Sequence, residues 1–450
     1  MDKVISIKKG LDIKIEGKAQ AHLGSVDAPS TFAVKPVDFK AIRPKLLVAE
    51  GDEVKAGTPL AFNRKNDQVM ITAPVSGEIV KIQRGPKRVL EAIVILADKT
   101  TDYEDFGAAD PNDLDREAVV EKLCKSGAWT FLRRRPFDIT PLPSETPKSI
   151  FISGFDSAPL STSQSFALKG KQSLFQTGID ALAKLTDGKV HLGLSADQEN
   201  ASALTEAKNV EKHYFSGPHP AGNVGIQIHH VDPINRDEAV WYIKPQDVAN
   251  IGYLFQEGKY HPERVVAVAG SEVQKRLHYK TILGANIAPF VKNNVSTDKK
   301  LRYISGNVLT GKKIDSDGFF CYFDDLLTVI PEGDQPEFLG WLLPSYPRPS
   351  MSKTFPWTFD NEAIFKVDTN TNGEERPFVI SGQYEKVLPM DLYPVFLLKA
   401  ILAEDFDKME GLGIYEVAAE DFALCEFVCT SKMPVQEIIE RGLDIMREEG

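Results

Sequence analysis

The chain has 450 residues, of which 42% are hydrophobic and 26% are charged, and its formal net charge is -11. A chain of this length is usually divided among roughly three domains, and this composition excludes a wholly disordered protein. The negative charge argues against nucleic acid as a partner, and we find no basic run with interleaved aromatics of the kind that nucleic-acid grooves demand. Four cysteines are too few for a disulfide framework.

No segment is predicted to cross a membrane. The longest mainly apolar run, residues 393–403, is interrupted by Pro394 and Lys399, whereas a spanning helix needs about 20 apolar residues. Residues 1–15 alternate charged and branched side chains and lack the pattern of a secretion signal. We therefore expect a chain that stays in the cytoplasm without direct membrane insertion.

Hairpins are predicted between residues 46 and 82. Gly51 and Gly57 lie at turns, while Val48, Val54 and Leu60 supply an inward-facing apolar set. The segments GDEVKAGTPL (51–60) and APVSGEIVKI (73–82) resemble the barrel-sandwich fold of biotinyl and lipoyl carrier domains. We assign residues 1–110 to such a barrel-sandwich hybrid domain.

Strands and helices then alternate along the chain. An amphipathic helix is predicted over 113–127, and the elements that follow it are strand 149–154, helix 174–185, strand 191–195, helix 197–212 and strand 265–269. This alternation predicts a Rossmann-like α/β domain over residues 111–265. Neither GxGxxG nor a Walker A sequence is present, so we interpret the domain as one without a nucleotide motif.

The last part of the chain mixes strands and helices. Two strands around a glycine turn are predicted within 301–314, in a compact α+β module over 266–345. Helices are predicted over 391–402 and 434–449, in a C-terminal helical domain over 346–450. The fold class is therefore α+β multidomain.

Cys425 and Cys429 have the spacing of the last two cysteines in the iron-sulfur pattern C-x2-C-x2-C-x3-C-P. Ala419 and Phe422 occupy the first two cysteine positions, and Thr430 replaces the proline. Two thiolates cannot hold a four-iron cluster, so the pair is a remnant of a cluster motif. A buried free pair and a partial metal site shared with another subunit remain as alternatives.

The segment SGPHPAGNVG (216–225) is rich in glycine and proline. It is either a docking or ligand loop, with Gly217, His219 and Gly222 as candidates, or a structural loop whose histidine packs. The adjacent His229 and His230 would diverge on a strand, which is poor geometry for one metal. We predict no metal site.

Seven segments together carry a resemblance to a known family. They are IKKGLDIKI (7–15), RPKLLVAEGDEVK (43–55), TAPVSGEI (72–79), GPKRVL (85–90), GAWTFLRRRPF (127–137), FSGPHPAG (215–222) and ALCEFVCTSK (423–432). These segments resemble the A subunits of the Na+-translocating NADH:quinone reductases, the NqrA family.

The resemblance implies a six-subunit respiratory complex that oxidises NADH, reduces quinone and exports Na+. It implies that residues 266–345 form an SLBB-like β-grasp module and that the C-terminal domain resembles a degenerate ferredoxin-like end. This subunit would be structural, contribute to quinone access, or both. It would bind no cofactor and would not be catalytic when isolated, since the complex uses NADH, the flavins, the iron-sulfur centre and quinone on other subunits. It would lie on the cytoplasmic side of the bacterial inner membrane, held there by subunits B to F.

A quinone, if it contacts this subunit, needs an aromatic slot with donors for its carbonyl oxygens. The segment WTFLRRRPF offers Trp129, Phe131, Arg133, Arg135 and Phe137 as candidates. An equally good interpretation makes it a hinge between two domains, with packed aromatics and paired arginines.

A carrier protein is the alternative function, with a covalent group on Lys65 of the lipoyl-like hairpin. Its neighbours Arg64 and Asn66 are not the acidic or methionine residues that modifying enzymes read. We therefore prefer an unmodified turn residue at Lys65.

Overall fold

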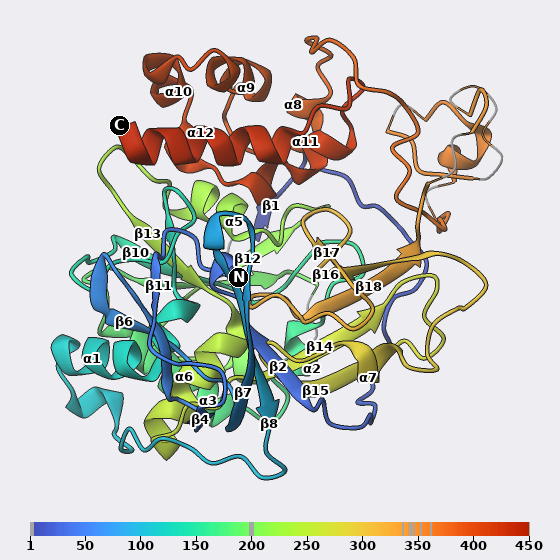
Figure 1. Ribbon diagram of the computed structural model, residues 1–450. Coiled ribbons are helices and arrows are strands. Elements are labelled where there is room, and N and C mark those ends of the chain that lie inside the picture. Colours follow the sequence, from blue (N-terminus) through green and yellow to red (C-terminus); the bar gives the residue numbers. More distant parts are fainter. Residues whose placement is uncertain are drawn as a thin grey trace.

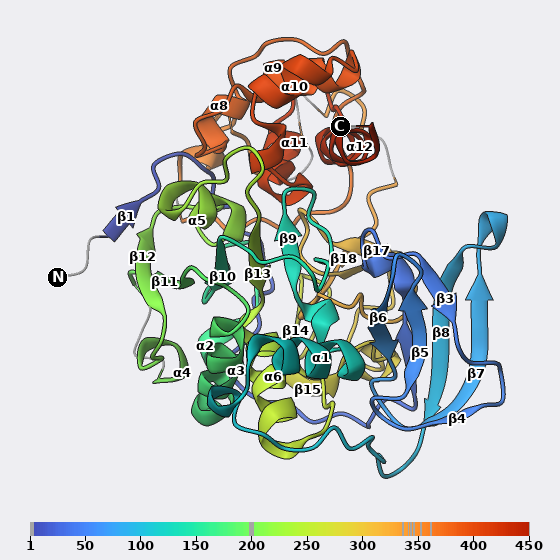
Figure 2. The same cartoon turned by 90° about the vertical axis from the view of Figure 1, so that its left-hand side faces the viewer.

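The computed structural model describes residues 4–197, 202–334, 337–340, 342, 344, 347–351, 353–360 and 362–449. Residues 31–97 form two small antiparallel sheets that pack face to face as the barrel-sandwich unit, drawn in blue on the right of Figure 2. The first contains β2 (Thr31–Val34), β8 (Leu90–Ala97), β7 (Gly77–Arg84) and β4 (Glu53–Val54), and the second contains β3 (Pro44–Leu46), β5 (Pro59–Asn63) and β6 (Asn66–Thr72).

Alternating side chains fill the space between these two sheets. Leu60, Ile71, Ile79 and Ile95 are all at most 2% exposed, as expected where every second residue of a strand points inward. Ile79 on β7 lies opposite Ile95 on β8. The barrel-sandwich prediction is confirmed.

A six-stranded sheet forms the centre of the molecule. Its strands, in spatial order, are β1 (Val4–Ser6), β12 (Glu211–Ser216), β11 (Val190–Ser195), β10 (Ser149–Ser153), β13 (Val240–Ile243) and β9 (Arg133–Arg135). Neighbouring strands are parallel except β9, which is antiparallel to β13. Its helices are α1 (Arg116–Ser126), α2 (Gln164–Ala167), α3 (Gln172–Ala183), α4 (Ser202–Thr205), α5 (Val224–Val231) and α6 (Pro245–Glu257).

Local sequence explains where α1 begins and ends. The Asp115 carboxylate accepts a hydrogen bond from the Ala118 N–H at 2.8 Å, and Gly127 ends the helix with a φ of 83°. The predicted helix is confirmed with slightly shorter bounds. Helices α3 and α6 lie in close contact with each other. Gly178 on α3 and Gly252 on α6 each face the backbone of the other helix, so no side chain separates the two backbones at these positions.

A five-stranded sheet forms the next unit. It contains β15 (His278–Ile282), β14 (Glu263–Ala269), β18 (Leu326–Pro331), β16 (Leu301–Ser305) and β17 (Lys312–Ile314), and α7 (Ala288–Val291) follows β15. Strands β16 and β17 are the predicted pair around a glycine turn. The predicted boundary at 265/266 falls inside β14, which pairs with β15 and β18.

Helices cover one end of the molecule, shown in red in Figure 1. They are α8 (Tyr384–Val387), α9 (Pro394–Leu402), α10 (Phe406–Gly411), α11 (Ala423–Phe427) and α12 (Val435–Glu449). The two predicted C-terminal helices correspond to α9, which starts later than expected, and α12. The predicted domains 266–345 and 346–450 include positions outside the described residues, namely 335, 336, 341, 343, 345, 346, 352, 361 and 450.

The N-terminal segment does not belong to the barrel-sandwich unit. Strand β1 pairs with β12 at the edge of the central sheet (Figure 2), and Ile7, Ile13 and Ile15 share a core with the C-terminal helices. The predicted domain 1–110 therefore includes a segment that packs outside the two small sheets. A strand of only three residues has too short a hydrophobic pattern to predict the sheet to which it belongs.

Two further predictions are corrected. The predicted helix 197–212 is replaced by the short α4 and by β12, which begins at Glu211, while positions 198–201 lie outside the described residues. His229 and His230 lie in the last turn of α5 and not on a strand. Among the described residues, no helix is both long and apolar enough to cross a membrane.

Candidate functional site

A cavity of about 150 Å³ lies at the carboxyl edge of the central sheet. The chain leaves β10 toward β11 on one side, whereas β13 pairs on the other side of β10. Such a switch in strand order leaves a crevice where α/β proteins commonly bind ligands. Ser153 ends β10 and Asp156 follows it at this crevice, while Lys244 and Pro245 follow β13.

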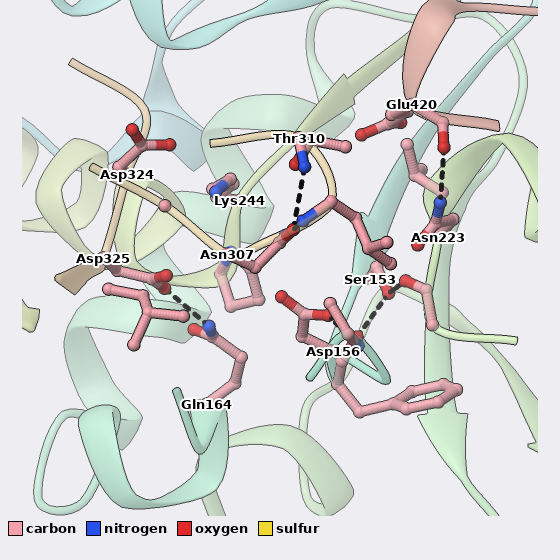
Figure 3. Close-up of a pocket in the computed structure, with 18 of the residues that line it drawn as sticks. Ser153, Asp156, Gln164, Asn223, Lys244, Asn307, Thr310, Asp324, Asp325 and Glu420 are labelled. Carbon is pink, nitrogen blue, oxygen red and sulfur yellow. Dashed lines mark hydrogen bonds between the residues drawn. The ribbon is translucent and has the colours of Figure 1, made fainter. Parts of the chain in front are cut away.

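Three structural units close the cavity (Figure 3). Asn307 and Thr310 come from the turn between β16 and β17, and the Asn307 amide oxygen accepts from the Thr310 N–H at 2.9 Å. Asp325, just before β18, accepts from the Gln164 amide at 2.8 Å. Glu420 comes from a short 3-10 turn, Ala419–Phe422, in the C-terminal unit. The cavity therefore requires the tertiary arrangement of the central sheet, the five-stranded sheet and the C-terminal helices.

The charges around the cavity are mainly negative. Asp156, Asp324, Asp325 and Glu420 line it together with Lys244 (Figure 3). Burial raises the pKa of Asp156, and the nearby Asp325 raises it further. Burial also raises the pKa of Asp324, although Lys244 opposes that shift. Both carboxyl groups therefore ionise less readily than they would in water.

A dinucleotide or flavin nucleotide does not fit this cavity. Nucleotide phosphates are held by free backbone N–H groups at a helix N-terminus and by cationic side chains, whereas carboxylates surround this crevice. The volume of about 150 Å³ is also below the roughly 300 Å³ at which pockets for small organic ligands begin. The arrangement can hold a few waters or a small polar molecule, and we derive no redox step from it.

The aromatic residues of the segment 129–137 are part of the core. Trp129 and Phe131 are 0% and 1% exposed. The Trp129 indole N–H donates to the Pro141 carbonyl at 2.8 Å and its ring lies edge-on to Trp241. Phe131 stacks on Tyr260 and Tyr322. In this structure a quinone headgroup cannot reach Trp129 or Phe131 without opening the core.

The three arginines of β9 are paired with carboxylates. Arg135 is fully buried and forms ion pairs with Asp421 and Glu420. The distance from Arg135 Nη2 to Glu420 Oε1 is 2.5 Å. Arg133 pairs with Asp138, and Arg134 pairs with Glu145 at 3.1 Å. Burial alone would raise the pKa of Asp138, but Arg133 and other nearby cations lower it overall.

These contacts are those expected for a packed connection between units. Arg135 joins the central sheet to the C-terminal helices through Asp421, while Phe137 is half-buried with its ring edge-on to Tyr415. Of the five residues proposed for quinone, only Arg133 and Phe137 retain some exposure in this structure. Contact between quinone and this segment stays a prediction for those two.

The predicted docking loop lies against the cavity. His219 is 4% exposed, its Nδ1 is 3.0 Å from the Ser157 hydroxyl, and its backbone N–H donates to Asp12 at 2.9 Å. Gly217 has a φ of 123°, and a Cβ there would meet the Ile7 carbonyl at 2.0 Å. At Gly222 a Cβ would meet the Ser157 backbone nitrogen at 2.5 Å. The loop therefore packs within the chain, as in the structural alternative.

Cys425 and Cys429 are both buried in the C-terminal core. The Tyr384 hydroxyl donates to the Cys429 sulfur at 2.9 Å, and burial raises the pKa of Cys425 well above its usual range. Within the described ranges, neither cysteine belongs to a group of three residues placed to hold a metal. This is the arrangement of a buried free pair.

Lys65 lies exposed in the two-residue turn between β5 and β6. A carrier lysine would need this exposure, but so would an ordinary turn residue. The exposure therefore does not distinguish the two interpretations.

Sequence reasoning missed most of the cavity residues. Asp156 had a usable signal, because it closely follows a predicted strand. Lys244 had one too, since the aromatic and branched strand VWYI at 240–243 precedes Lys244-Pro245, a helix start. Asp324 and Asp325 had none, because only the packing of the five-stranded sheet brings them to this crevice.

Comparison with known proteins identifies the family. Family profiles match residues 5–98 as the NqrA N-terminal barrel-sandwich hybrid domain, residues 114–260 as the NqrA second alpha/beta domain, and residues 265–316 as the NQRA C-terminal domain. The A subunit of the Na(+)-translocating NADH-quinone reductase from Rhodopirellula baltica is 38% identical over 99% of both chains. The corresponding subunits from Tolumonas auensis and Haemophilus influenzae are 37% and 38% identical over 99% of this chain and 100% of theirs.

The chain belongs to this family. The last of the three matched domains is an SLBB domain that covers most of β14 and all of β15, β16 and β17, in agreement with the predicted β-grasp module. Among solved structures, an air-oxidised NAD+-reducing NiFe hydrogenase is similar over 76% of this chain and 62% of its own, with 11% identity and a TM-score of 0.38.

Proposed function

We propose that this chain is the A subunit of a Na+-translocating NADH:quinone reductase and that it contributes structure and partner contacts, while other subunits carry the redox groups. One observation carries the proposal: the curated relatives bearing this name align over 99% of the chain. Identity of 37–38% over such a length, without a missing domain, supports the same place in the same assembly.

The chemistry of the chain supports a role without a bound redox group. The crevice of the central sheet is surrounded by Asp156, Asp324 and Asp325, which oppose nucleotide phosphates. Cys425 and Cys429 are buried among core residues, and the first two positions of the cluster pattern are Ala419 and Phe422. We therefore place NADH oxidation, the flavins, the iron-sulfur centre and quinone reduction on the other five subunits, B to F.

A surface on α9 and α10 is suited to contact with a partner subunit. Tyr393, Phe396 and Leu402 are 67%, 50% and 43% exposed. Tyr393 and Phe396 border a groove of about 640 Å³ between the two helices, together with Ala400 and Leu412. Exposed apolar groups gathered at a groove are typical of a protein contact. We propose that a partner subunit covers this groove and holds the chain at the cytoplasmic side of the inner membrane.

The assembly can be tested with the full chain in its native membrane. A tagged chain, purified in mild detergent, should bring with it Na+-stimulated NADH:quinone reductase activity and five further polypeptides. Purification of the chain without that activity from a membrane that contains it would contradict the proposal.

The groove can be tested in the same preparation. Phe396→Asp replaces an exposed aromatic ring of the groove by a carboxylate and should reduce the co-purified reductase activity by at least about tenfold, because the apolar contact is lost and covering the new charge costs free energy. Phe359→Asp is the matched control, since Phe359 is 68% exposed and lies outside the groove. Equal loss in both variants, or in neither, would show that the groove is not the contact.

A further inference from the structure

Two histidines and a glutamate meet on one face of the central sheet, away from the crevice described above. Strands β11 and β12 run parallel, with His191 beside Glu211 and Gly193 beside His213. Residues two apart on a strand share a face, and paired residues of neighbouring parallel strands also share one. His191, Glu211 and His213 therefore project to the same side. Gly193, between the two histidines, has no side chain, and the Gln227 amide lies against it.

The potential ligand atoms of these side chains are close together. His191 Nδ1 is 3.0 Å from His213 Nε2 and 3.7 Å from Glu211 Oε2, and all three ligand atoms lie within 4.8 Å of one another. A tetrahedral zinc ion with bonds of about 2.0–2.1 Å separates its ligand atoms by roughly 3.3 Å. Small rotations of the three side chains would bring them to that geometry.

Both imidazoles are in the form that binds metals. Burial lowers the pKa of His191 to about 4, with a further contribution from His213, and burial also lowers the pKa of His213. Neutral imidazole is the ligand form, so a metal need not displace protons from the nitrogens near neutral pH. The hydrogen bond between the two rings would be replaced by two metal bonds.

The neighbouring charged groups leave the site available. Lys189 lies 3.5 Å from Glu211 Oε1, which leaves Oε2 on the side of His191. Asp232 is engaged by Lys148 and by the Ser149 hydroxyl, both at 2.7 Å. The side chain of His191 is 7% exposed, whereas that of Glu211 is 49% exposed. A cation can therefore enter from the Glu211 side.

We propose that His191, Glu211 and His213 bind a divalent transition-metal cation of the zinc class, with three protein ligands and a fourth position open to water. Two nitrogens and one carboxylate favour zinc over magnesium or calcium, which prefer oxygen ligands. The bound ion would join the starts of β11 and β12. Strand β12 leads directly into the loop 217–222, so the ion would stabilise the strand that positions this loop.

Zinc titration of the purified, metal-free full chain tests the site. The wild-type chain should bind one Zn2+, show a higher thermal unfolding midpoint with Zn2+ present, and show the visible absorption of four-coordinate Co2+ when Co2+ replaces it. His213→Gln should weaken Zn2+ binding by at least about 100-fold, because even outer-sphere partners of metal ligands contribute roughly 10–100-fold.

Two further variants keep the test decisive. Glu211→Gln changes a largely exposed side chain, so the variant should fold and yet lose both most of the Zn2+ affinity and the Co2+ absorption. His22→Gln is the control, because His22 is exposed and lies outside the site, and it should bind Zn2+ like the wild type. Unchanged stoichiometry and affinity in folded Glu211→Gln and His213→Gln, or no Zn2+ binding by the wild type, would overturn the proposal.

Discussion

At the scale of single residues, Arg135 is the most constrained side chain of the segment 129–137. Its side chain is 0% exposed, as is that of its partner Asp421. The Asp421 carboxylate also accepts from the Ala418 N–H at 2.9 Å, which fixes the turn that carries Glu420. One guanidinium thus links the edge strand β9 to the C-terminal helices.

Removal of this arginine should destabilise the chain. Arg135→Ala leaves a buried carboxylate without its cation, and breaking such a pair typically costs about 3–5 kcal/mol of unfolding free energy. Urea unfolding measures the change. Arg441→Ala is the control and should cost at most about 1 kcal/mol, since Arg441 and Glu404 form an exposed ion pair. Equal effects of the two substitutions would contradict the structural role of Arg135.

The buried His219 should make stability depend on pH. Burial lowers its pKa to about 4, whereas the unfolded chain has a histidine pKa of about 6.5. Between these two pH values the unfolded state therefore binds more protons than the folded state. The neutral His219 contributes to the free energy of unfolding in full above about pH 6.5, and this contribution is lost as the pH falls to about 4. In wild type it amounts to roughly 3 kcal/mol.

Unfolding free energies measured at about pH 7 and about pH 4 test this expectation. The loss of stability between the two pH values should be smaller in His219→Gln than in wild type by about 3 kcal/mol. His22→Gln should behave like wild type, because His22 is exposed. If His219→Gln loses as much stability as wild type, the histidine is not held neutral in the folded chain.

At the scale of elements, the contact between α3 and α6 depends on the absence of two side chains. A Cβ on Gly252 would lie 1.8 Å from the Leu174 carbonyl oxygen, and a Cβ on Gly178 would lie 2.0 Å from the Val248 carbonyl oxygen. Backbone atoms cannot move aside as the end of a flexible side chain can. The two helices must therefore separate to admit even one methyl group.

Gly252→Ala should consequently destabilise the α/β unit, although alanine favours a helix over glycine by about 1 kcal/mol. Overpacking against backbone typically costs about 1–3 kcal/mol, which should outweigh the gain in helix propensity and make the variant less stable than the wild type. Gly411→Ala is a matched control in α10, because nothing lies within 4 Å of a Cβ there. Denaturant midpoints of both variants decide the matter, and an equal gain of stability would show that α3 and α6 are not in close contact.

At the scale of the whole molecule, the units are joined by shared cores. One hydrophobic cluster runs from the barrel-sandwich through the central sheet into the five-stranded sheet, and a second joins the C-terminal helices to Ile7, Ile13 and Ile15. The acidic cavity lies where three of the units meet. These features suit a rigid component of a larger assembly.

The recombinant chain should carry no redox or carrier group. Its absorption spectrum should show no flavin or iron-sulfur bands, because the crevice opposes nucleotide phosphates and the cluster pattern retains only Cys425 and Cys429. Its intact mass should equal the sequence mass. Stoichiometric flavin or iron after anaerobic purification would contradict the structural role, and an added lipoyl or biotinyl mass that is lost in Lys65→Arg would support the carrier alternative.

The sequence alone predicted the features that depend on local chemistry. Asp115 and Gly127 mark the two ends of α1, periodic apolar residues reveal α12, and the glycine turns of residues 51–82 predict the barrel-sandwich hairpins. The motif segments also led to the family. Each of these signals lies within a short stretch of chain, so no knowledge of distant contacts is needed to read it.

The tertiary structure alone decided the rest. Strand β1 was missed because its partner β12 lies about 200 residues away. The local sequence around the arginines of β9 does not tell whether they bind a ligand or form internal ion pairs. The position of Asp421 beside Arg135 shows the internal ion pair. The acidic cavity and the histidine pair on β11 and β12 likewise depend on strand order and register. Contacts between distant segments leave no periodic trace in a single sequence, since each partner obeys only its own local pattern.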